Sequence, residues 1–339
     1  MATMRDIASA SGVSLGAVSR ILNNDMTLSV TAATRQHVLE VAASMGYEKK
    51  PRSAHANTNA NSNTYSSLTF GILQWFSPTQ ELEDPYYLSV RLGVEDYCIN
   101  NNIKVVRAFR SDSDYSHALS GVNALVCIGK FDSAEISSFV DICPRLVIAD
   151  MHTNRLEYNS ISLDFEAAIG NMMEAFNSKG FKKIGFLDGR EFLSEENVYP
   201  DRRRELFVRF AREYDFEYEK FSAEGDFTSE SGYLMMKELI ESGDLPEAIF
   251  AASDSIAIGA LRALSEAHIS VPDDISLVGF NDISAAAYTT PPLTTIHAPA
   301  FEMGSYAACF IHKEHDLYAK LGTPLHMTLP CSLITRESL

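Results

Sequence analysis

Residues 3–23, Thr3-Met-Arg-Asp-Ile-Ala-Ser-Ala-Ser-Gly-Val-Ser-Leu-Gly-Ala-Val-Ser-Arg-Ile-Leu-Asn23, have the pattern of two short helices joined by a tight turn. Thr3 can cap the first helix and Ser14 the second, and Gly12 lies where the chain must bend. Three apolar residues of the second helix fall at i, i+3 and i+4, on one face: Val18, Ile21 and Leu22. The stretch therefore predicts a helical hairpin with one buried side.

The opposite face of the second helix is small, polar or basic, with Leu15, Gly16, Ser19 and Arg20. A helix-turn-helix needs this layout, because its second helix buries one side and lays the other in a DNA major groove. The alternative is an ordinary helical hairpin within a larger domain. The segment favours DNA binding.

A third helix is predicted from a cap at Thr31 to Met45, with apolar residues at helical spacing and Gly46 at its end. Its apolar positions are Val38, Leu39, Ala42 and Met45. It would complete a small helical headpiece over residues 1–52. Residues 53–67 are small and polar with no apolar face, which is typical of a linker, and residues 68–339 form the body.

The charge is distributed unevenly along the 339 residues, whose net charge is −17. Residues 1–52 hold six Lys or Arg against four acids, which gives +2; the remainder holds 22 against 41, which gives −19. An acidic body would be repelled from DNA everywhere except through the headpiece, so binding should be weak without the right sequence and its salt dependence modest.

The composition excludes several other classes of protein. Hydrophobic residues make up 46% of the chain and charged residues 22%, as in a soluble globular protein, and no run of 18 or more apolar residues would span a membrane. The N-terminus lacks the apolar stretch of a secretory signal. The five cysteines are scattered and form no C-x-x-C pair. We therefore expect reduced cysteines in a cytoplasmic protein.

From Leu68 onward, short β-rich runs alternate with helix-like segments, which predicts parallel sheet covered by helices on both faces. The pattern restarts near residue 183, so we expect two α/β lobes facing a cleft, with ligands beyond the carboxyl ends of the strands. The predicted strands are 68–73, 104–109, 124–128, 145–149, 183–187, 248–252 and 276–280, and the predicted helices are 86–101, 132–140, 201–213, 228–241 and 254–267.

Enzyme chemistry has no support in the sequence. The chain lacks a G-x-G-x-x-G fingerprint, a G-x-x-x-x-G-K-[ST] loop and a G-x-S-x-G elbow. Cys309, His312 and His315 suggest a metal site, but Cys309 and His315 would lie about 120° apart on a helix and no fourth ligand is evident. We expect no enzyme activity, no metal and no cofactor.

The whole chain resembles the LacI/GalR family of transcriptional repressors, especially the galactose and lactose repressors of Gram-positive bacteria. The motifs that carry the resemblance are Gly12-Val-Ser-Leu-Gly-Ala-Val-Ser-Arg-Ile-Leu-Asn23, Thr34-Arg35, Gly46-Tyr47, Asp84-Pro-Tyr-Tyr87, Ala252-Ser-Asp-Ser-Ile-Ala-Ile-Gly-Ala260, Val271-Pro-Asp-Asp-Ile-Ser276, Gly279-Phe-Asn-Asp282, Pro291-Pro-Leu-Thr-Thr295 and Leu333-Ile-Thr-Arg-Glu-Ser338. It implies a homodimer whose headpieces read a pseudo-palindromic operator, and a body folded like a periplasmic sugar-binding protein. Lobe 1 would span about 68–163 plus 292–330, and lobe 2 about 164–291 plus 331–339.

The resemblance implies DNA contacts at Thr3, Ser14, Leu15, Gly16, Ser19, Arg20 and Asn23. Arg20 can donate to guanine or phosphate and Leu15 can meet a thymine methyl group, although Leu15 could also be a stray surface residue. The hinge departs from the family pattern, because Ser53-Ala-His-Ala56 contains no leucine to wedge into the minor groove. We expect a weaker hinge contact, or an electrostatic one through Lys49, Lys50 and Arg52.

The effector contacts that the resemblance implies are Asp84, Tyr86, Tyr87, Arg203, Phe227, Ser253, Asp254 and Asn281. A sugar needs flat apolar faces for its C–H surface and polar groups for its hydroxyls, and this set supplies both. Either tyrosine could instead be a core residue, and Asp254 could cap the helix that begins there. Ala298 and Ala300 stand where the family often has polar residues.

We therefore expect a DNA-binding repressor of a carbohydrate-utilisation operon, controlled by a galactoside or galactose in the cleft. A sugar-binding receptor with the same body fold and no regulatory role is the alternative. The N-terminal helix-turn-helix pattern argues against that alternative.

Overall fold

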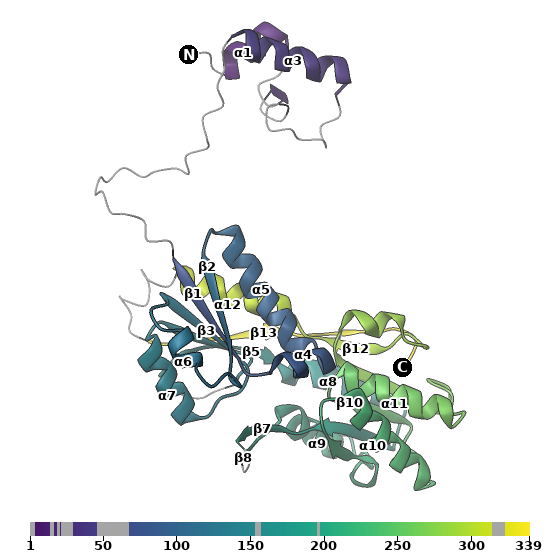
Figure 1. Ribbon diagram of the computed structural model, residues 1–339. Coiled ribbons are helices and arrows are strands. Elements are labelled where there is room, and N and C mark those ends of the chain that lie inside the picture. The colour runs from purple at the N-terminus through teal and green to yellow at the C-terminus, as the bar shows by residue number, and fades with distance from the viewer. Residues whose placement is uncertain are drawn as a thin grey trace. The chain divides into compact units, whose positions relative to one another are not determined.

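The computed structural model describes residues 4–13, 17–18, 21, 30–45, 68–152, 157–194, 197–313 and 323–339. The chain forms two compact units, Met1–Tyr65 and Ser66–Leu339 (Figure 1). None of the described helices is long and apolar enough to cross a membrane.

The N-terminal unit contains helices α1 (Met4–Ser11) and α3 (Ala32–Ser44). Among its described residues, Ile7, Val18, Ile21, Val38 and Ala42 are buried and form a core. Gly12 has φ +67°, a conformation that glycine adopts without strain, at the predicted bend. Leu39 and Met45 are 41% and 37% exposed, so the predicted apolar face of the third helix is narrower than expected.

The DNA contacts expected from the sequence lie outside the described residues. They are Thr3, Ser14, Leu15, Gly16, Ser19, Arg20, Asn23, Lys49, Lys50 and Arg52. Leu22 and the linker 53–67 lie outside as well.

The first lobe of the body is built on a six-stranded sheet in the order β13-β5-β4-β3-β1-β2. All of its neighbouring strands run parallel. The strands are β1 (Thr69–Gln74), β2 (Lys104–Phe109), β3 (Ala124–Ile128), β4 (Leu146–Ala149), β5 (Asn159–Asp164) and β13 (His326–Pro330).

The second lobe is built on another six-stranded sheet, in the order β14-β12-β11-β10-β6-β9. Its strands run parallel except β14, which is antiparallel to β12. They are β6 (Ile184–Gly189), β9 (Ala223–Gly225), β10 (Ala248–Ala251), β11 (Ser276–Asn281), β12 (Thr294–His297) and β14 (Ser332–Ile334). A separate hairpin, β7 (Glu191–Ser194) and β8 (Asn197–Tyr199), follows β6.

Helices cover these sheets (Figure 1). They are α4 (Pro78–Glu83), α5 (Tyr86–Asn100), α6 (Tyr115–Ala118), α7 (Ser133–Ile142), α8 (Phe165–Ser178), α9 (Arg202–Glu213), α10 (Ser229–Glu241), α11 (Asp254–Glu266) and α12 (Ala300–Lys313), with 3₁₀ turns at Glu219–Phe221 and Ser284–Tyr288. Polar side chains cap several of them: Ser77 and Asp132 in capping boxes, and Thr228 and Ser253 at single N-caps.

The two lobes are joined by three crossings of the chain. The crossings follow β5, β12 and β13. Strand β12 belongs to the second sheet, whereas the next helix, α12, packs against α5 in the first lobe. The boundary at residue 292 predicted from the sequence placed β12 in the first lobe. Strand propensity gives no sign of which sheet a strand joins, because that choice depends on pairing partners far away in the chain.

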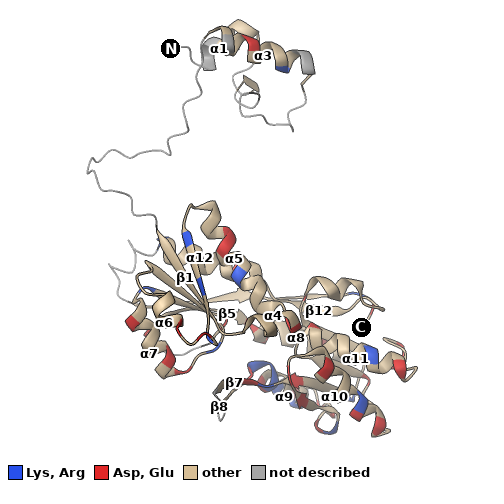
Figure 2. Ribbon diagram, in the orientation of Figure 1, with Lys and Arg blue, Asp and Glu red and all other residues tan. Residues whose placement is uncertain are grey.

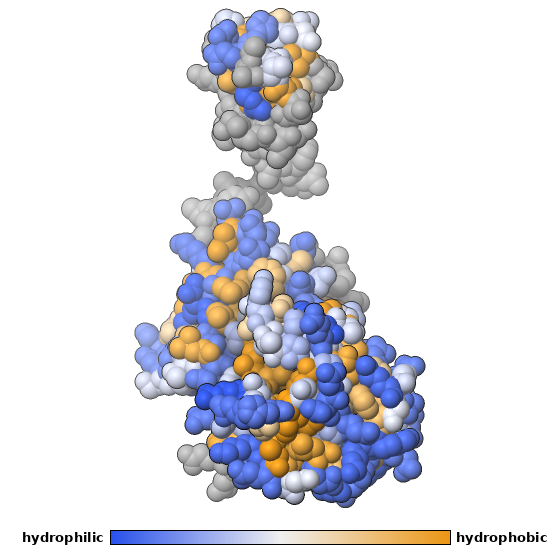
Figure 3. All heavy atoms as spheres, turned by 90° about the vertical axis from the view of Figure 1, so that its right-hand side faces the viewer, coloured by the Kyte–Doolittle hydropathy of each residue, from blue (hydrophilic) through white to orange (hydrophobic). Residues whose placement is uncertain are grey.

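Charged residues are confined mainly to helices and loops, and β1, β3, β4 and β10 contain none (Figure 2). These buried strands pack into one continuous hydrophobic core together with the helices. Hydrophobic area is also visible on the surface of the body, bordered by hydrophilic residues (Figure 3). Large exposed apolar side chains include Leu82 at 84%, Ile99 at 72% and Tyr288 at 87%.

Candidate effector site

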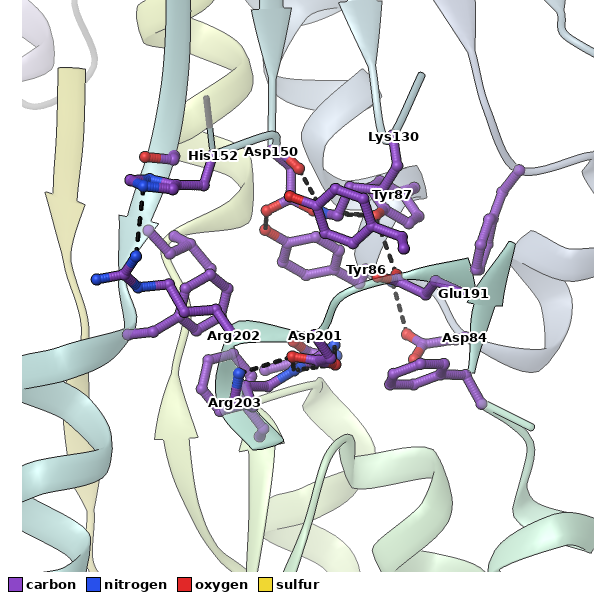
Figure 4. Close-up of a pocket in the computed structure, with 18 residues that line it drawn as sticks. Asp84, Tyr86, Tyr87, Lys130, Asp150, His152, Glu191, Asp201, Arg202 and Arg203 are labelled. Carbon is purple, nitrogen blue, oxygen red and sulfur yellow. Dashed lines mark hydrogen bonds and ion pairs between the residues drawn. The ribbon is translucent and has the colours of Figure 1, made fainter. Parts of the chain in front are cut away.

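A pocket lies between the two lobes, at the carboxyl ends of strands from both sheets (Figure 4). It encloses about 620 Å³ of space, part of it open to solvent. This interlobe pocket is lined by Phe76, Asp84, Tyr86, Tyr87, Lys130, Asp150, His152, Ser162, Leu163, Phe165, Glu191, Tyr199, Asp201, Arg202, Arg203, Phe227, Phe280 and Asn281.

Asp150 organises the side of the pocket formed by lobe 1. Its carboxylate accepts hydrogen bonds from the hydroxyls of Tyr86 and Tyr87, each at 2.9 Å, and forms an ion pair with Lys130. Burial alone would lower the pKa of Lys130, but Asp150 and Glu191 raise it above its ordinary value. Lys130 is therefore a fixed cation whose charge Asp150 balances.

Gly129 brings Lys130 to this position. It has φ +115°, and a Cβ there would lie 2.4 Å from Cβ of Trp75. Only glycine tolerates both the backbone conformation and this close approach, so β3 can end directly beside β1 and direct Lys130 into the pocket.

Arg203 organises the opposite side, at the start of α9. Its guanidinium donates to both carboxylate oxygens of Asp201, at 2.6 to 3.0 Å, and to the carbonyl of Ala252 at 2.7 Å. It also lies 4.9 Å from the ring centroid of Phe227 and 5.4 Å from that of Phe280. Burial opposes the charge, but Asp201 raises the pKa of Arg203, so the guanidinium is held charged and oriented.

Aromatic rings supply flat apolar surface from both lobes. The rings of Tyr86 and Tyr87 lie 5.1 Å apart, and that of Phe76 lies 4.7 Å from Tyr87. On the other side Phe165 stacks on Phe280 at 5.7 Å. Rings beside hydrogen-bonding groups suit a molecule with apolar C–H faces and polar edges.

Two carboxyl groups in the pocket, Asp84 and Glu191, have no ion-pair partner within hydrogen-bonding distance among the described residues. Burial raises the pKa of Asp84 to about 6, although the backbone N–H of Tyr86 and the charge of Arg203 lower it. Burial likewise raises the pKa of Glu191 to about 7, against the charges of Lys130 and Arg203. Both groups have hydrogen-bonding capacity to offer a ligand.

Six of the effector residues expected from the sequence line this pocket: Asp84, Tyr86, Tyr87, Arg203, Phe227 and Asn281. Both tyrosines therefore face it. Ser253 and Asp254 do not line it, and both are fully buried. The Ser253 hydroxyl caps α11, while Asp254 accepts hydrogen bonds from Thr295 Oγ1 at 2.5 Å and from the Ile283 N–H at 2.8 Å.

The sequence interpretation missed Lys130, Asp150, Glu191, Tyr199 and Asp201. Asp150 directly follows the end of β4 and Lys130 lies two residues beyond the end of β3, so the rule that ligands bind at the carboxyl ends of strands points to both. Glu191 and Tyr199 belong to the β7–β8 hairpin, which the sequence reading did not recognise. Ala298 and Ala300 border a different cavity, near Asn281 and Asp282.

His312, considered above for a metal site, is used in packing. Its Nδ1 lies 3.0 Å from the Tyr97 hydroxyl, and its ring packs edge-on against Phe70 and Tyr97. The described part of the chain contains no group of three His, Cys, Asp or Glu placed to hold a metal ion, and His315 lies outside it.

The two lobes and the pocket between them define an effector-binding domain of the periplasmic-binding-protein type. Residues 173–339 match the family model for the periplasmic binding protein-like domain, and residues 3–50 match that for bacterial regulatory proteins of the lacI family. The chain belongs to the lacI family of bacterial regulatory proteins, a family of transcriptional regulators rather than enzymes.

Curated relatives cover the whole chain. The chain is 36% identical to the HTH-type transcriptional regulator GalR of Streptococcus thermophilus, over 100% of this chain and 99% of that protein. It is 32% identical to the HTH-type transcriptional repressor MelR of Bacillus subtilis, over 100% and 97%. A crystal structure of the lac repressor dimer bound to operator and the anti-inducer ONPF shares the fold, with a TM-score of 0.69, 22% identity, and coverage of 99% of this chain and 98% of that chain.

Proposed function

We propose that this regulator represses a carbohydrate-utilisation operon and that a sugar bound in the interlobe pocket controls its binding to operator DNA. The observation that carries the proposal is the pocket itself, where both lobes contribute aromatic rings and oriented polar groups. The family membership supplies the regulatory output.

A sugar fits the chemistry of this pocket. Tyr86, Tyr87 and Phe227 offer flat surfaces to C–H groups, while Asp84, Arg203 and Asn281 offer acceptors and donors to hydroxyls. The cations Lys130 and Arg203 are each paired with a carboxylate of the protein, so a ligand need not bring a negative charge.

We assign a galactoside or galactose as the effector, on the likeness to GalR-type regulators. The pocket is built from both lobes, so a ligand there favours one lobe arrangement over another. A coupling free energy of about 1–3 kcal/mol between sugar and DNA suffices for a useful switch.

We further propose that the regulator acts as a homodimer on a pseudo-palindromic operator. Two headpieces separated by one turn of DNA read two half-sites, so two-fold symmetry of the protein is matched by the DNA. The charge of +2 on residues 1–52 against −19 on the remainder limits DNA contact to the headpieces.

The test is operator binding by the purified full chain. Duplexes that the chain selects from a random library would be labelled, and their binding followed by fluorescence anisotropy with and without galactose and a panel of galactosides. We expect selected sites to be two-fold symmetric and at least one of the sugars to change the operator Kd by about 5- to 150-fold. If none of these sugars changed operator affinity, the effector assignment would be wrong.

Deletion of residues 1–52 separates a regulator from a receptor or an enzyme. A regulator so truncated loses DNA binding and keeps sugar binding, because the body forms its own compact unit, Ser66–Leu339. Retention of operator binding by the truncated chain would contradict the proposal.

A further inference from the structure

The β7–β8 hairpin belongs to the second lobe but contacts the first. The side chain of Arg110, which is also paired with Glu135 at 2.5 Å, donates to the backbone carbonyl of Leu193 in β7. The ring of Tyr199 in β8 lies 5.5 Å from Lys130 Nζ. The hairpin therefore forms a wall of the interlobe pocket that both lobes hold in place.

Glu191, the first residue of the hairpin, is a buried acid with spare hydrogen-bonding capacity. It is 8% exposed, and its Oε1 lies 3.5 Å from the Tyr87 hydroxyl. That hydroxyl lies closer to Asp150, at 2.9 Å, so its single proton is better placed on Asp150. Neither carboxylate oxygen of Glu191 has a short hydrogen bond within the described part of the chain.

A second cavity, the outer cavity, adjoins the interlobe pocket at this hairpin. It shares Phe76, Glu191 and Phe227 with the interlobe pocket and continues to Trp75, Gln80 and Phe192. It encloses about 900 Å³, part of it open to solvent. Glu191 lies at the boundary of the two spaces, where a ligand that occupies both would meet it.

The outer cavity has the chemistry of a saccharide site. Trp75 and Phe192 supply aromatic surface, and Gln80 supplies an amide with both donors and an acceptor. The guanidinium of Arg110 is neutralised by Glu135, and Arg190 lies 3.8 Å from Glu224. Because its cations have carboxylate partners, the cavity favours a neutral ligand over a phosphorylated one.

We propose that the effector is a neutral disaccharide whose first unit occupies the interlobe pocket, whose second unit occupies the outer cavity, and whose hydroxyls near the glycosidic bond are bound by Glu191. This inference rests on the proposed sugar-controlled function and makes it more specific: a galactoside with a second sugar unit is the ligand, and free galactose fills only half of the site. Glu191 is thus assigned as a specificity-determining residue.

Isothermal titration of the full chain tests the proposal with lactose and melibiose, which carry β- and α-linked galactose, and with methyl β-galactoside and methyl α-galactoside. We expect one disaccharide to bind at least 10-fold more tightly than the methyl galactoside of the same linkage. At pH 8, where Glu191 is ionised, Glu191→Gln should weaken that disaccharide about 10- to 100-fold, as expected for loss of a charge-assisted hydrogen bond.

The decisive variants lie side by side on the hairpin. Phe192 is 41% exposed and lines the outer cavity, whereas Val198, its partner in the β7–β8 register, is 46% exposed and lines neither space. Phe192→Ala should weaken the disaccharide about 3- to 10-fold and leave the methyl galactoside unchanged. Val198→Ala should change neither the disaccharide affinity nor the methyl galactoside affinity. Because both side chains are exposed, both variants should fold.

The possible failures can be told apart. Equal affinities for disaccharide and methyl galactoside, or equal losses in Phe192→Ala and Val198→Ala, would overturn the outer subsite while leaving a sugar-controlled repressor intact. If none of the four sugars bound, the galactoside effector itself would be refuted, and this inference with it.

Discussion

Lys130 and Asp150, which follow the neighbouring parallel strands β3 and β4, form an ion pair in which the two side chains are only 8% and 6% exposed. Asp150 is also the common acceptor for the hydroxyls of Tyr86 and Tyr87. One carboxylate therefore fixes a cation and two aromatic rings, which makes this side of the pocket a single hydrogen-bonded unit.

Removal of one partner of this pair should be costly. Lys130→Met leaves a buried carboxylate without its cation, and we expect a loss of about 3–5 kcal/mol in the free energy of unfolding. Urea denaturation of the full chain measures it. The control is Arg262→Met, which removes the exposed pair Arg262–Glu266 and should change the free energy of unfolding far less. Similar losses of stability in the two variants would show that the buried Lys130–Asp150 pair is no more important for stability than an exposed one.

Ser253 should matter for stability rather than for the sugar. Ser253→Ala removes the N-cap of α11, a change that costs about 0.5–2 kcal/mol, yet the side chain does not line the interlobe pocket. We expect a lower urea midpoint and a sugar Kd within about twofold of the original protein. A large loss of sugar affinity at unchanged stability would show that Ser253 binds the effector, as the family resemblance implies.

The stability of the body should fall as the pH rises from 5.5 to 7.5. Burial raises the pKa of Asp84 and Asp188 to about 6 and that of Glu191 and Asp254 to about 7, from ordinary values of 3.8 for aspartate and 4.5 for glutamate. Between the unfolded and folded values the folded chain holds more protons, so raising the pH through this window destabilises it.

Urea unfolding at the two pH values checks this prediction. Asp254→Asn removes one of these four titrating carboxyls and should reduce the difference in stability between pH 5.5 and pH 7.5. Equal or greater stability at pH 7.5 in the unchanged chain would contradict this prediction.

In the headpiece, Arg20 and Leu15 should carry most of the sequence discrimination, because the linker offers no leucine to intercalate. Replacement of either by Ala should weaken operator binding by about 1–3 kcal/mol, whereas His55→Ala should have little effect. Anisotropy titrations on one selected operator compare the three variants. An equal loss for His55→Ala would place recognition in the hinge as well.

Much of the site could be predicted because its residues stand in recognisable local contexts. Tyr86 and Tyr87 begin a helix after Pro85, and Asn281 ends a strand, so their positions follow from nearby sequence. Asp254 also stands in a recognisable local context, at the start of a helix after a strand. Its carboxylate nevertheless accepts hydrogen bonds from Thr295 and from the backbone of Ile283, residues that only the folded second sheet brings near.

Other contacts depend on surfaces that meet only in three dimensions. Glu191 and Tyr199 lie on strands of four and three residues, too short for a reliable alternating pattern, and their neighbours Tyr87 and Lys130 belong to the other lobe. The membership of β12 in the second sheet likewise depends on its pairing with strands that are distant in the sequence.

The contact between α5 and α12 has a mechanical consequence. A Cβ at Gly93 would lie 1.9 Å from the Phe301 carbonyl oxygen, and one at Gly304 would lie 1.8 Å from that of Val90, so the two helix backbones touch directly. Tyr86 and Tyr87 form the first turn of α5, whose 15 residues span about 22 Å. A shift that a ligand imposes on the tyrosines should therefore move the two helices together, because at these two glycines no side chain lies between the backbones to absorb the displacement.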